Sequence, residues 1–288
     1  MTKIQDLGRR NFLKTAGIAT VAGATASLAT NSVNAASPGM PKLANGRYDF
    51  DTVYNRVGTN CARWDGAARR YPEGAFKFGM GVASQDFECA PCITEALAER
   101  VNHHNWGYMG GTDDLRQEIV KWNGDRNNLD LNPDELTISD GVYPGMIAAM
   151  RAFVPAGGKI LIISPAYSGF YTMARAANVG TVDSQMVIKN GRYEVDWDDL
   201  EAKMTPDVRL LIVCNPQNPT GNVWKSDELH RMGRLALDHN IVVLSDEIHA
   251  DVVRKGHKLT PFAAVPDQEV VNNSLSFVAI SKTFNMAG

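Results

Sequence analysis

Three features are scarce or missing in the 288-residue sequence, and each excludes a class of protein. Long basic runs are missing and the net charge is −3, so a nucleic-acid partner is not expected. Residues 16–29 form a short run of mostly small residues, which does not suffice for a membrane-spanning helix. Adjacent His103 and His104 cannot share one helix face and have no third ligand at metal spacing, so a metal site is not expected there. With 44% hydrophobic and 21% charged residues, the chain is expected to be globular, with one large domain or two.

Cysteine is scarce as well, with four residues. Disulfides could form in an oxidising compartment, and Cys89 and Cys92 have the spacing of a redox pair where Pro91 is predicted to open a helix. A helix N-terminus would lower the pKa of a thiol there. No strand and helix typical of thioredoxins precede the pair, however. Packing at a helix start is therefore the favoured interpretation, and a redox role is the alternative.

The first 35 residues are typical of a twin-arginine export signal. Arg9 and Arg10 precede the mild apolar run, which ends at the small residues of 33–35. A disordered basic tail is the alternative. Removal of residues 1–35 takes away four basic residues and one acidic residue, so the net charge changes from −3 to −3 − (4 − 1) = −6. The twin-arginine machinery exports folded proteins, so we expect a soluble periplasmic protein that acquires a cofactor before export.

From residue 86 onward, strand and helix patterns alternate, which predicts an α/β fold: a three-layer sandwich around a mostly parallel sheet. Strands are expected at residues 136–139, 159–164, 210–214, 241–245 and 274–280, and the last strand is expected to be buried. Helices are expected from residues 91, 113, 141, 168, 196 and 226, the last one capped by Ser226. Residues 36–47 are predicted to be a linker, 48–85 a segment of a second, smaller domain and 86–288 the large domain.

Polar and aromatic residues that follow four of these strands form the strongest functional signal. Tyr167, Asn218, Asp246 and Lys282 each come shortly after a predicted strand. Because parallel sheets bind ligands beyond the carboxyl ends of their strands, we expect all four side chains at one edge. Each has an ordinary alternative: an aspartate can cap a helix, Asn-Pro can form a plain turn and a lysine can lie in a solvated loop.

An aromatic ring, an amide, a carboxylate and an amine at one edge suit pyridoxal 5′-phosphate (PLP). Lys282 is the candidate catalytic residue, because burial favours the neutral form of an amine, and a neutral amine can form a Schiff base with the cofactor's aldehyde. Asp246 would keep the pyridine nitrogen protonated, and Asn218 would bind the ring oxygen. Tyr167 would stack on the ring.

Three motifs in this region carry a family resemblance. Residues 215–221 (Asn-Pro-Gln-Asn-Pro-Thr-Gly), 245–249 (Ser-Asp-Glu-Ile-His) and 281–285 (Ser-Lys-Thr-Phe-Asn) resemble those of the class I/II aminotransferase superfamily, fold type I PLP enzymes. More narrowly, they are similar to its cystathionine β-lyase and cystalysin branch. The resemblance covers roughly residues 48–288.

The resemblance implies further site residues and a partner subunit. Gly141 and Val142 would bind the phosphate, where a helix start offers free backbone amides. Tyr108 would reach the phosphate of the neighbouring subunit, which implies a homodimer. Ser281 and His249 would lie at the cofactor. Many aminotransferases have a tyrosine at the position of His249, whereas the lyase branch has histidine.

The sequence departs from the family pattern at two places. Residues 83–85 are Ala-Ser-Gln, where the branch usually has Ala-Asp-Met, although Asp86 and Phe87 match. The family also continues past the lysine into a small domain whose arginine binds the substrate carboxylate, and six residues follow Lys282 here. We therefore expect the 288-residue chain to be at best weakly active and prone to associate.

The first hypothesis is a periplasmic PLP enzyme that cleaves the carbon–sulfur bond of cystathionine or a cysteine conjugate, giving pyruvate, ammonia and a thiol. An aminotransferase on the same scaffold is the alternative, because residues 218–221 are equally common there. A binding protein or an inactive fragment is the third hypothesis. The substrate side chain is not predicted.

Overall fold

The computed structural model describes residues 42–52, 56–76, 79–108 and 110–287. The predicted export signal, residues 1–35, and the start of the predicted linker lie outside the described residues. The chain divides into two compact units, Met1–Asp49 and Phe50–Gly288. In the described part of the first unit, Lys42 and Tyr48 form an antiparallel bridge, and the Lys42 ammonium lies 5.2 Å from the centre of the Tyr48 ring.

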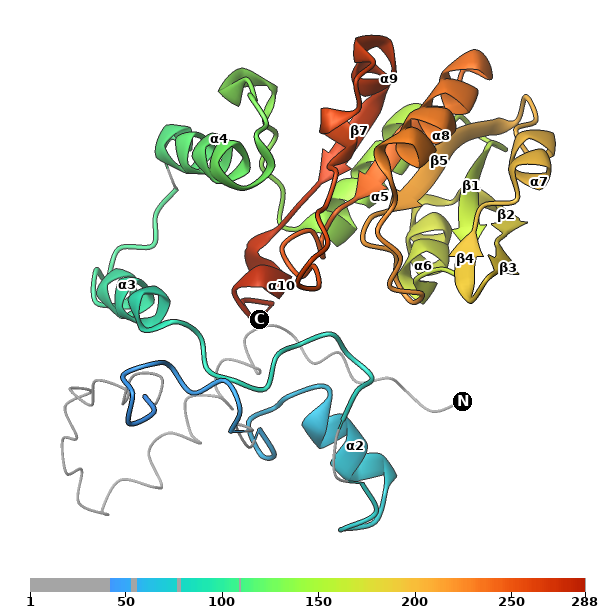
Figure 1. Cartoon of the computed structure of the whole chain (residues 1–288). Coiled ribbons are helices and arrows are strands. Elements are labelled where there is room, and N and C mark those ends of the chain that lie inside the picture. The colour runs from blue at the N-terminus through green and yellow to red at the C-terminus, as the bar shows by residue number, and fades with distance from the viewer. Residues whose placement is uncertain (1–41, 53–55, 77–78, 109, 288) are drawn as a thin grey trace, which may run out of the picture. The chain divides into compact units, whose positions relative to one another are not determined.

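A five-stranded parallel sheet forms the centre of the second unit (Figure 1). Its strands lie in the order β2-β1-β5-β6-β7, and every neighbouring pair is parallel. They are β1 (Lys159–Ser164), β2 (Gly180–Gln185), β5 (Val208–Cys214), β6 (Val242–Asp246) and β7 (Ser274–Phe277). The chain runs from β1 outward to β2 and then continues on the other side of β1, so the strand order reverses between β1 and β5.

Helices cover both faces of the sheet, because the central strands carry apolar side chains on both sides. The covering helices are α5 (Val142–Phe153), α6 (Ser168–Ala177), α7 (Trp197–Ala202), α8 (Ser226–Asp238) and α9 (Gln268–Asn272). One core cluster contains Met146, Met150, Ile160, Ile162, Phe170, Met173, Leu210, Ile212 and Leu244. The other contains Leu161, Ile163, Leu211, Val213, Leu229, Met232, Ala236 and Val243. Burial of each large apolar side chain contributes about 1.5–3 kcal/mol. These findings confirm the predicted α/β fold class.

A short antiparallel hairpin and several small helices complete the unit. The hairpin strands β3 (Val187–Lys189) and β4 (Arg192–Glu194) are joined by Asn190 and Gly191, both at positive φ, 51° and 76°. The helices are α2 (Trp64–Arg70), α3 (Pro91–Val101), α4 (Asp113–Asn127), η1 (Pro133–Glu135), η2 (Phe262–Ala264) and α10 (Ile280–Thr283). The first four of these contain no buried residue among the described ones.

The structure corrects three local predictions. Residues 136–139 form no strand, because no neighbouring strand pairs with them and Ile138 stays 40% exposed. The prediction that the last strand is buried was wrong: β7 lies at the sheet edge, and Leu275 is 38% exposed. Lys225 occupies the capping position of α8 that was assigned to Ser226, and its backbone N–H donates to Glu228 at 2.8 Å.

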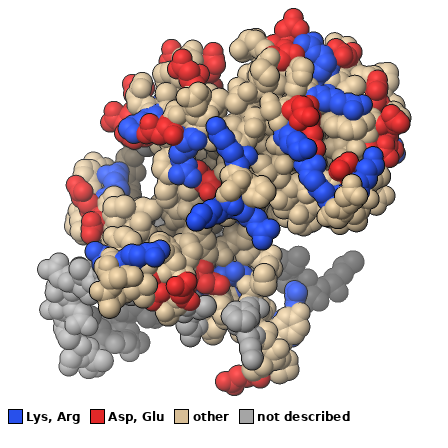
Figure 2. All heavy atoms as spheres, in the orientation of Figure 1, with Lys and Arg blue, Asp and Glu red and all other residues tan. Residues whose placement is uncertain are grey.

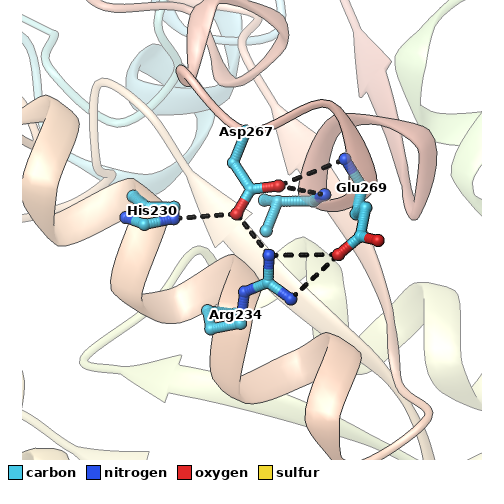
Figure 3. Close-up of polar contacts among 5 residues, drawn as sticks. His230, Arg234, Asp267 and Glu269 are labelled. Carbon is cyan, nitrogen blue, oxygen red and sulfur yellow. Dashed lines mark hydrogen bonds and ion pairs between the residues drawn. The ribbon is translucent and has the colours of Figure 1, made fainter.

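Polar contacts fix α9 against α8 (Figure 3). Asp267 caps α9 by accepting from the backbone N–H groups of Glu269 and Val270. It also accepts from Arg234 and, at 2.9 Å, from His230, both in α8. The hydrogen bond from Arg234 is the main reason that the pKa of Asp267 falls to about 2.

The surface and the helices show two further general features. Acidic and basic side chains are interspersed on the visible face around α7 and α8 (Figure 2). Within the described part of the chain, no helix has both the length and the apolar character that crossing a bilayer requires.

Candidate active site

The predicted site begins where neighbouring strands end. Cys214 of β5 and Phe277 of β7 both lie in register with Asp246, the last residue of β6. The side-chain amide of Gln217 donates to the carbonyl of Pro165 at 2.7 Å, which ties the loop after β5 to the loop after β1. Gln217 was missed by the sequence analysis. The loops are therefore joined at the point where the strand order reverses, a usual ligand position in such sheets.

Asp246 is a buried carboxylate with unused hydrogen-bonding capacity. Its side chain is 4% exposed and accepts one hydrogen bond from a described residue, from the backbone N–H of Ile248 at 3.2 Å. Burial raises the pKa of Asp246 to about 6, against the opposing effects of that hydrogen bond and of the Lys282 charge. The carboxylate is thus suited to a ligand that brings a hydrogen-bond donor.

Glu247 is a second buried carboxylate, which the sequence analysis did not single out. It accepts from the Ser245 hydroxyl at 2.9 Å and from the backbone N–H of Phe262 at 2.7 Å. Burial raises the pKa of Glu247 to about 7, and the neighbouring Asp246 charge adds to the rise. Because its oxygens bind groups of the protein, Glu247 holds η2 against the end of β6.

Lys282 lies in α10, five residues after β7, and is half-buried. Its ε-amine donates a hydrogen bond to the backbone carbonyl of Ala83 at 2.8 Å. Its positive charge lowers the pKa values of both Asp246 and His249. For His249, burial is the larger cause of the lowered pKa. All three residues lie at or after the carboxyl ends of the neighbouring strands β6 and β7.

The segment that carries Lys282 is held by residues 83–87. The side-chain amide of Gln85 donates to the Lys282 carbonyl at 3.0 Å. Asn285 accepts from the backbone N–H of Gln85 and donates to the carbonyl of Phe87, each at 3.2 Å. The Ala-Ser-Gln departure from the family pattern therefore lies directly against the segment that carries Lys282.

The start of α5 presents free backbone donors. Gly141 occupies the capping position with φ at 122°, and no side chain caps the helix. Val142 is the first helical residue, so its N–H has no acceptor within the helix. Gly145, one turn later, allows Phe277 of β7 to approach: a Cβ there would come 3.3 Å from the Phe277 ring. This packing places the helix start beside the end of β7, as the predicted phosphate site requires.

Tyr167 and Asn218 follow β1 and β5 as predicted. Tyr167 is 39% exposed, and its ring packs edge-to-face on Phe170, with centroids 5.5 Å apart. The ring lies over Gly169, where a Cβ would come within 2.8 Å of the ring atom Cδ1. Asn218 is half-buried, and its side chain forms no hydrogen bond to any described residue. Its amide is therefore free to bind a ligand.

Two predicted residues lie apart from this group or show no specific contact. Ser281 is half-buried in α10 beside Lys282. Tyr108 is fully exposed and contacts none of the other predicted site residues in the described part of the chain.

No group of three His, Cys, Asp or Glu side chains among the described residues could hold a metal ion.

The chain is similar in sequence to a known family and to characterised proteins. The model of the family "Aminotransferase class I and II" matches residues 75–288. The cystathionine beta-lyase PatB of Bacillus subtilis (strain 168) is 36% identical over 241 residues, which cover 83% of this chain and 62% of PatB.

Two solved structures are similar as well. Cystalysin from Treponema denticola, which contains a pyridoxal 5′-phosphate cofactor, has a TM-score of 0.79 and 31% identity, covering 84% of this chain and 61% of cystalysin. The PLP-bound C-S lyase from Staphylococcus hominis has a TM-score of 0.75 and 32% identity, with coverages of 84% and 61%. The chain thus spans about three fifths of the length of these proteins.

Proposed function

The chain belongs to the aminotransferase class I and II family, and from this membership we propose that it is a PLP-dependent carbon–sulfur lyase. Its substrate would be cystathionine or another cysteine S-conjugate, and its products pyruvate, ammonia and a thiol. The observation that carries the proposal is the buried carboxyl group of Asp246, which accepts a single hydrogen bond and lies in register with Phe277, five residues before Lys282, at the carboxyl edge of the sheet. The names of the similar lyases support the choice of reaction.

The residues at the site suit PLP on three structural grounds. Asp246 offers a buried carboxylate to a protonated ring nitrogen, a pairing that would offset the cost of burying either charge. Asn218 has a free amide for the ring oxygen. The uncapped start of α5 at Gly141 and Val142 suits a phosphate group.

When bound, PLP supplies an electron sink for the bonds at the substrate's α-carbon. Lys282 would hold the cofactor's aldehyde carbon covalently between turnovers and carry the α-proton during turnover. Asp246 would keep a proton on the ring nitrogen, and this positive partner would lower the pKa of Asp246 again. Tyr167 would cover one face of the ring.

An aminotransferase is the second candidate, because the matching family includes these enzymes and residues 218–221 suit both reactions. His249 favours the lyase, because a histidine at this position resembles the lyase branch. Product analysis decides: the lyase releases pyruvate and a free thiol from cystathionine without an added keto acid. Turnover that requires 2-oxoglutarate or another acceptor would favour transamination instead.

The cofactor assignment has its own test. The purified protein is incubated with PLP, reduced with borohydride and mapped by peptide mass spectrometry. The label is expected on Lys282. A label on another lysine, or none, would overturn the assignment.

We also propose the location and assembly of the protein. Residues 1–35 would direct export by the twin-arginine machinery to the periplasm, which the Arg9-Arg10 pair supports. The protein would act as a homodimer in which Tyr108 reaches the phosphate of the partner subunit. The full exposure of Tyr108 leaves it free for such a contact.

A further inference from the structure

The turn after β6 follows the buried carboxylates of Asp246 and Glu247 and contacts α10, the helix that contains Lys282. Residues 247–252 form a turn with two hydrogen bonds: the N–H of Ala250 donates to the Glu247 carbonyl, and the N–H of Val252 donates to the His249 carbonyl. Asp251 lies near the end of this turn, and its side chain is 19% exposed. Nothing in the sequence pattern marked Asp251 as a site residue.

The carboxylate of Asp251 connects three elements. Its Oδ2 accepts from the hydroxyl of Thr283 at 2.7 Å, and Thr283 is the neighbour of Lys282 in α10. Its Oδ1 accepts from the indole N–H of Trp122 at 3.2 Å and pairs with Nε of Arg126 at 2.8 Å. Trp122 and Arg126 both belong to α4, so one side chain joins α4, the turn after β6 and α10.

Aromatic contacts reinforce the same junction. The Trp122 ring packs against the Phe284 ring, which follows α10, with centroids 5.4 Å apart and planes at 62°. The Arg126 guanidinium lies over the Trp122 ring, 4.7 Å from its centre. These contacts fix the Trp122 and Arg126 donors in place, so the position of Oδ1 is defined by α4.

Helix α10 has few features of its own that could fix its orientation. It has four residues, none of them buried. A helix of one turn gains little from its backbone hydrogen bonds. Side-chain bonds from neighbouring elements must therefore supply much of its orientation.

We propose that Asp251 is a positioning residue that holds α10, and with it Lys282, against α4 and the turn after β6. One oxygen holds Thr283, while α4 holds the other. An asparagine would replace one of the two acceptor oxygens with an NH₂ group, so it could satisfy Thr283 or the α4 donors but not both. The role of Lys282 as the reactive amine rests on the proposed function, whereas its positioning rests on these contacts alone.

The test compares Asp251→Asn and Thr283→Val with Thr283→Ser, which keeps the hydroxyl. The 288-residue chain is mixed with PLP, and the label on Lys282 is followed over time by borohydride reduction and peptide mapping. We expect labelling to be slower by about tenfold in both Asp251→Asn and Thr283→Val, since the first loses one acceptor and the carboxylate charge and the second loses the hydroxyl that donates to it. Thr283→Ser is expected to stay near the unmodified rate.

Amide hydrogen exchange of residues 280–286, measured without PLP, is the second readout. Exchange is expected to be faster in Asp251→Asn and Thr283→Val. Asp267→Asn is the matched control, because it makes the same change in a carboxylate whose partners lie in α8 and α9. It should lower thermal stability and leave both readouts unchanged.

The two readouts distinguish failure of the positioning role of Asp251 from failure of the proposed function. Unchanged labelling and exchange in both test variants, or equal effects in Asp267→Asn, would overturn the positioning role. If Asp251→Asn does not fold, Thr283→Val decides alone. If the unmodified chain is not labelled at Lys282, the proposed function fails, and amide exchange still decides whether Asp251 orders α10.

Discussion

The ε-amine of Lys282 donates a hydrogen bond to the backbone carbonyl of Ala83, although 199 residues separate the two. The segment with the unexpected Ala-Ser-Gln sequence is thus in direct contact with the proposed reactive amine. Before Lys282 can form a Schiff base with an aldehyde, the amine must lose its proton. Residues 83–87 therefore control the resting position of the lysine.

Replacement of Gln85 with leucine tests this control. The change removes the donor to the Lys282 carbonyl while keeping a similar side-chain size. We expect the free energy of unfolding to fall by about 1 kcal/mol and amide exchange in residues 280–286 to accelerate. Gln268→Leu is the control, since its amide bonds the exposed Asn272 in α9. Equal exchange in the two variants would contradict the prediction.

The buried carboxyl groups predict how stability changes with pH. In the cofactor-free protein, burial raises the pKa of Asp246 to about 6 and that of Glu247 to about 7. The folded state then keeps protons that the unfolded state has released. The free energy of unfolding should fall as pH rises from about 4 to about 7, by at most about 3–4 kcal/mol for each group.

Urea denaturation across this pH range measures the effect. Asp246→Asn and Glu247→Gln should each flatten the fall, because each removes one of the two titrating groups. The prediction fails if both variants lose stability with pH as steeply as the unmodified protein.

Gly169 is predicted to determine the position of the Tyr167 ring. A Cβ at Gly169 would overlap that ring, so Gly169→Ala should displace it from Phe170. We expect a loss of about 1–3 kcal/mol in the free energy of unfolding and weaker PLP binding, measured by fluorescence titration. Gly66→Ala in α2 is the control, since nothing lies within 4 Å and alanine favours the helix. PLP binding that is unchanged in Gly169→Ala would refute the role of the ring.

Asp246→Asn should separate cofactor attachment from turnover. Lys282 should still be labelled by PLP and borohydride, because its amine is unchanged. Turnover should fall on the order of 10²-fold or more, since a ring nitrogen without its carboxylate partner is a poorer electron sink. Asp207→Asn is the control, because Asp207 pairs with Lys159 at the amino end of β1. Comparable turnover in the two variants would argue against the assignment of Asp246.

The export signal can be tested in cells. Replacement of both Arg9 and Arg10 with lysine should leave the protein in the cytoplasm with residues 1–35 uncut. Cell fractionation and the mass of the product measure this, and Lys14→Arg serves as the control. Normal delivery of the double variant to the periplasm would refute the proposed twin-arginine export.

The sequence predicted the elements that are buried on both faces. The strand at 159–164 matches β1 at both ends, and the helix predicted from residue 168 begins where α6 does, because these patterns are local signals. Residues 136–139 have a similar pattern without a pairing strand, and pairing is not local. Strand β2 was missed because its exposed positions interrupt any apolar run.

From the sequence, only those residues of the candidate site that follow directly after predicted strands could be identified. Asp246 and Lys282 could be placed at one edge from the order of strands alone. The structural role of Glu247 could not be predicted, since it depends on a hydrogen bond from the backbone N–H of Phe262 in another loop. Gln217, Asp251 and Ala83 likewise act through contacts with residues far away in the sequence, for which spacing and composition contain no signal.

The order of the strands also affects how the protein matures on the ribosome. Strand β7 is the edge strand and the last of the five to be synthesised, so the other four can assemble before it. The carbonyl of Ala83 emerges early and must wait for Lys282, and closing so long a loop is slow. A nascent chain therefore has the carboxylate of the site before it has the amine. On the proposed function, attachment of the cofactor to Lys282 waits until α10 has left the exit tunnel.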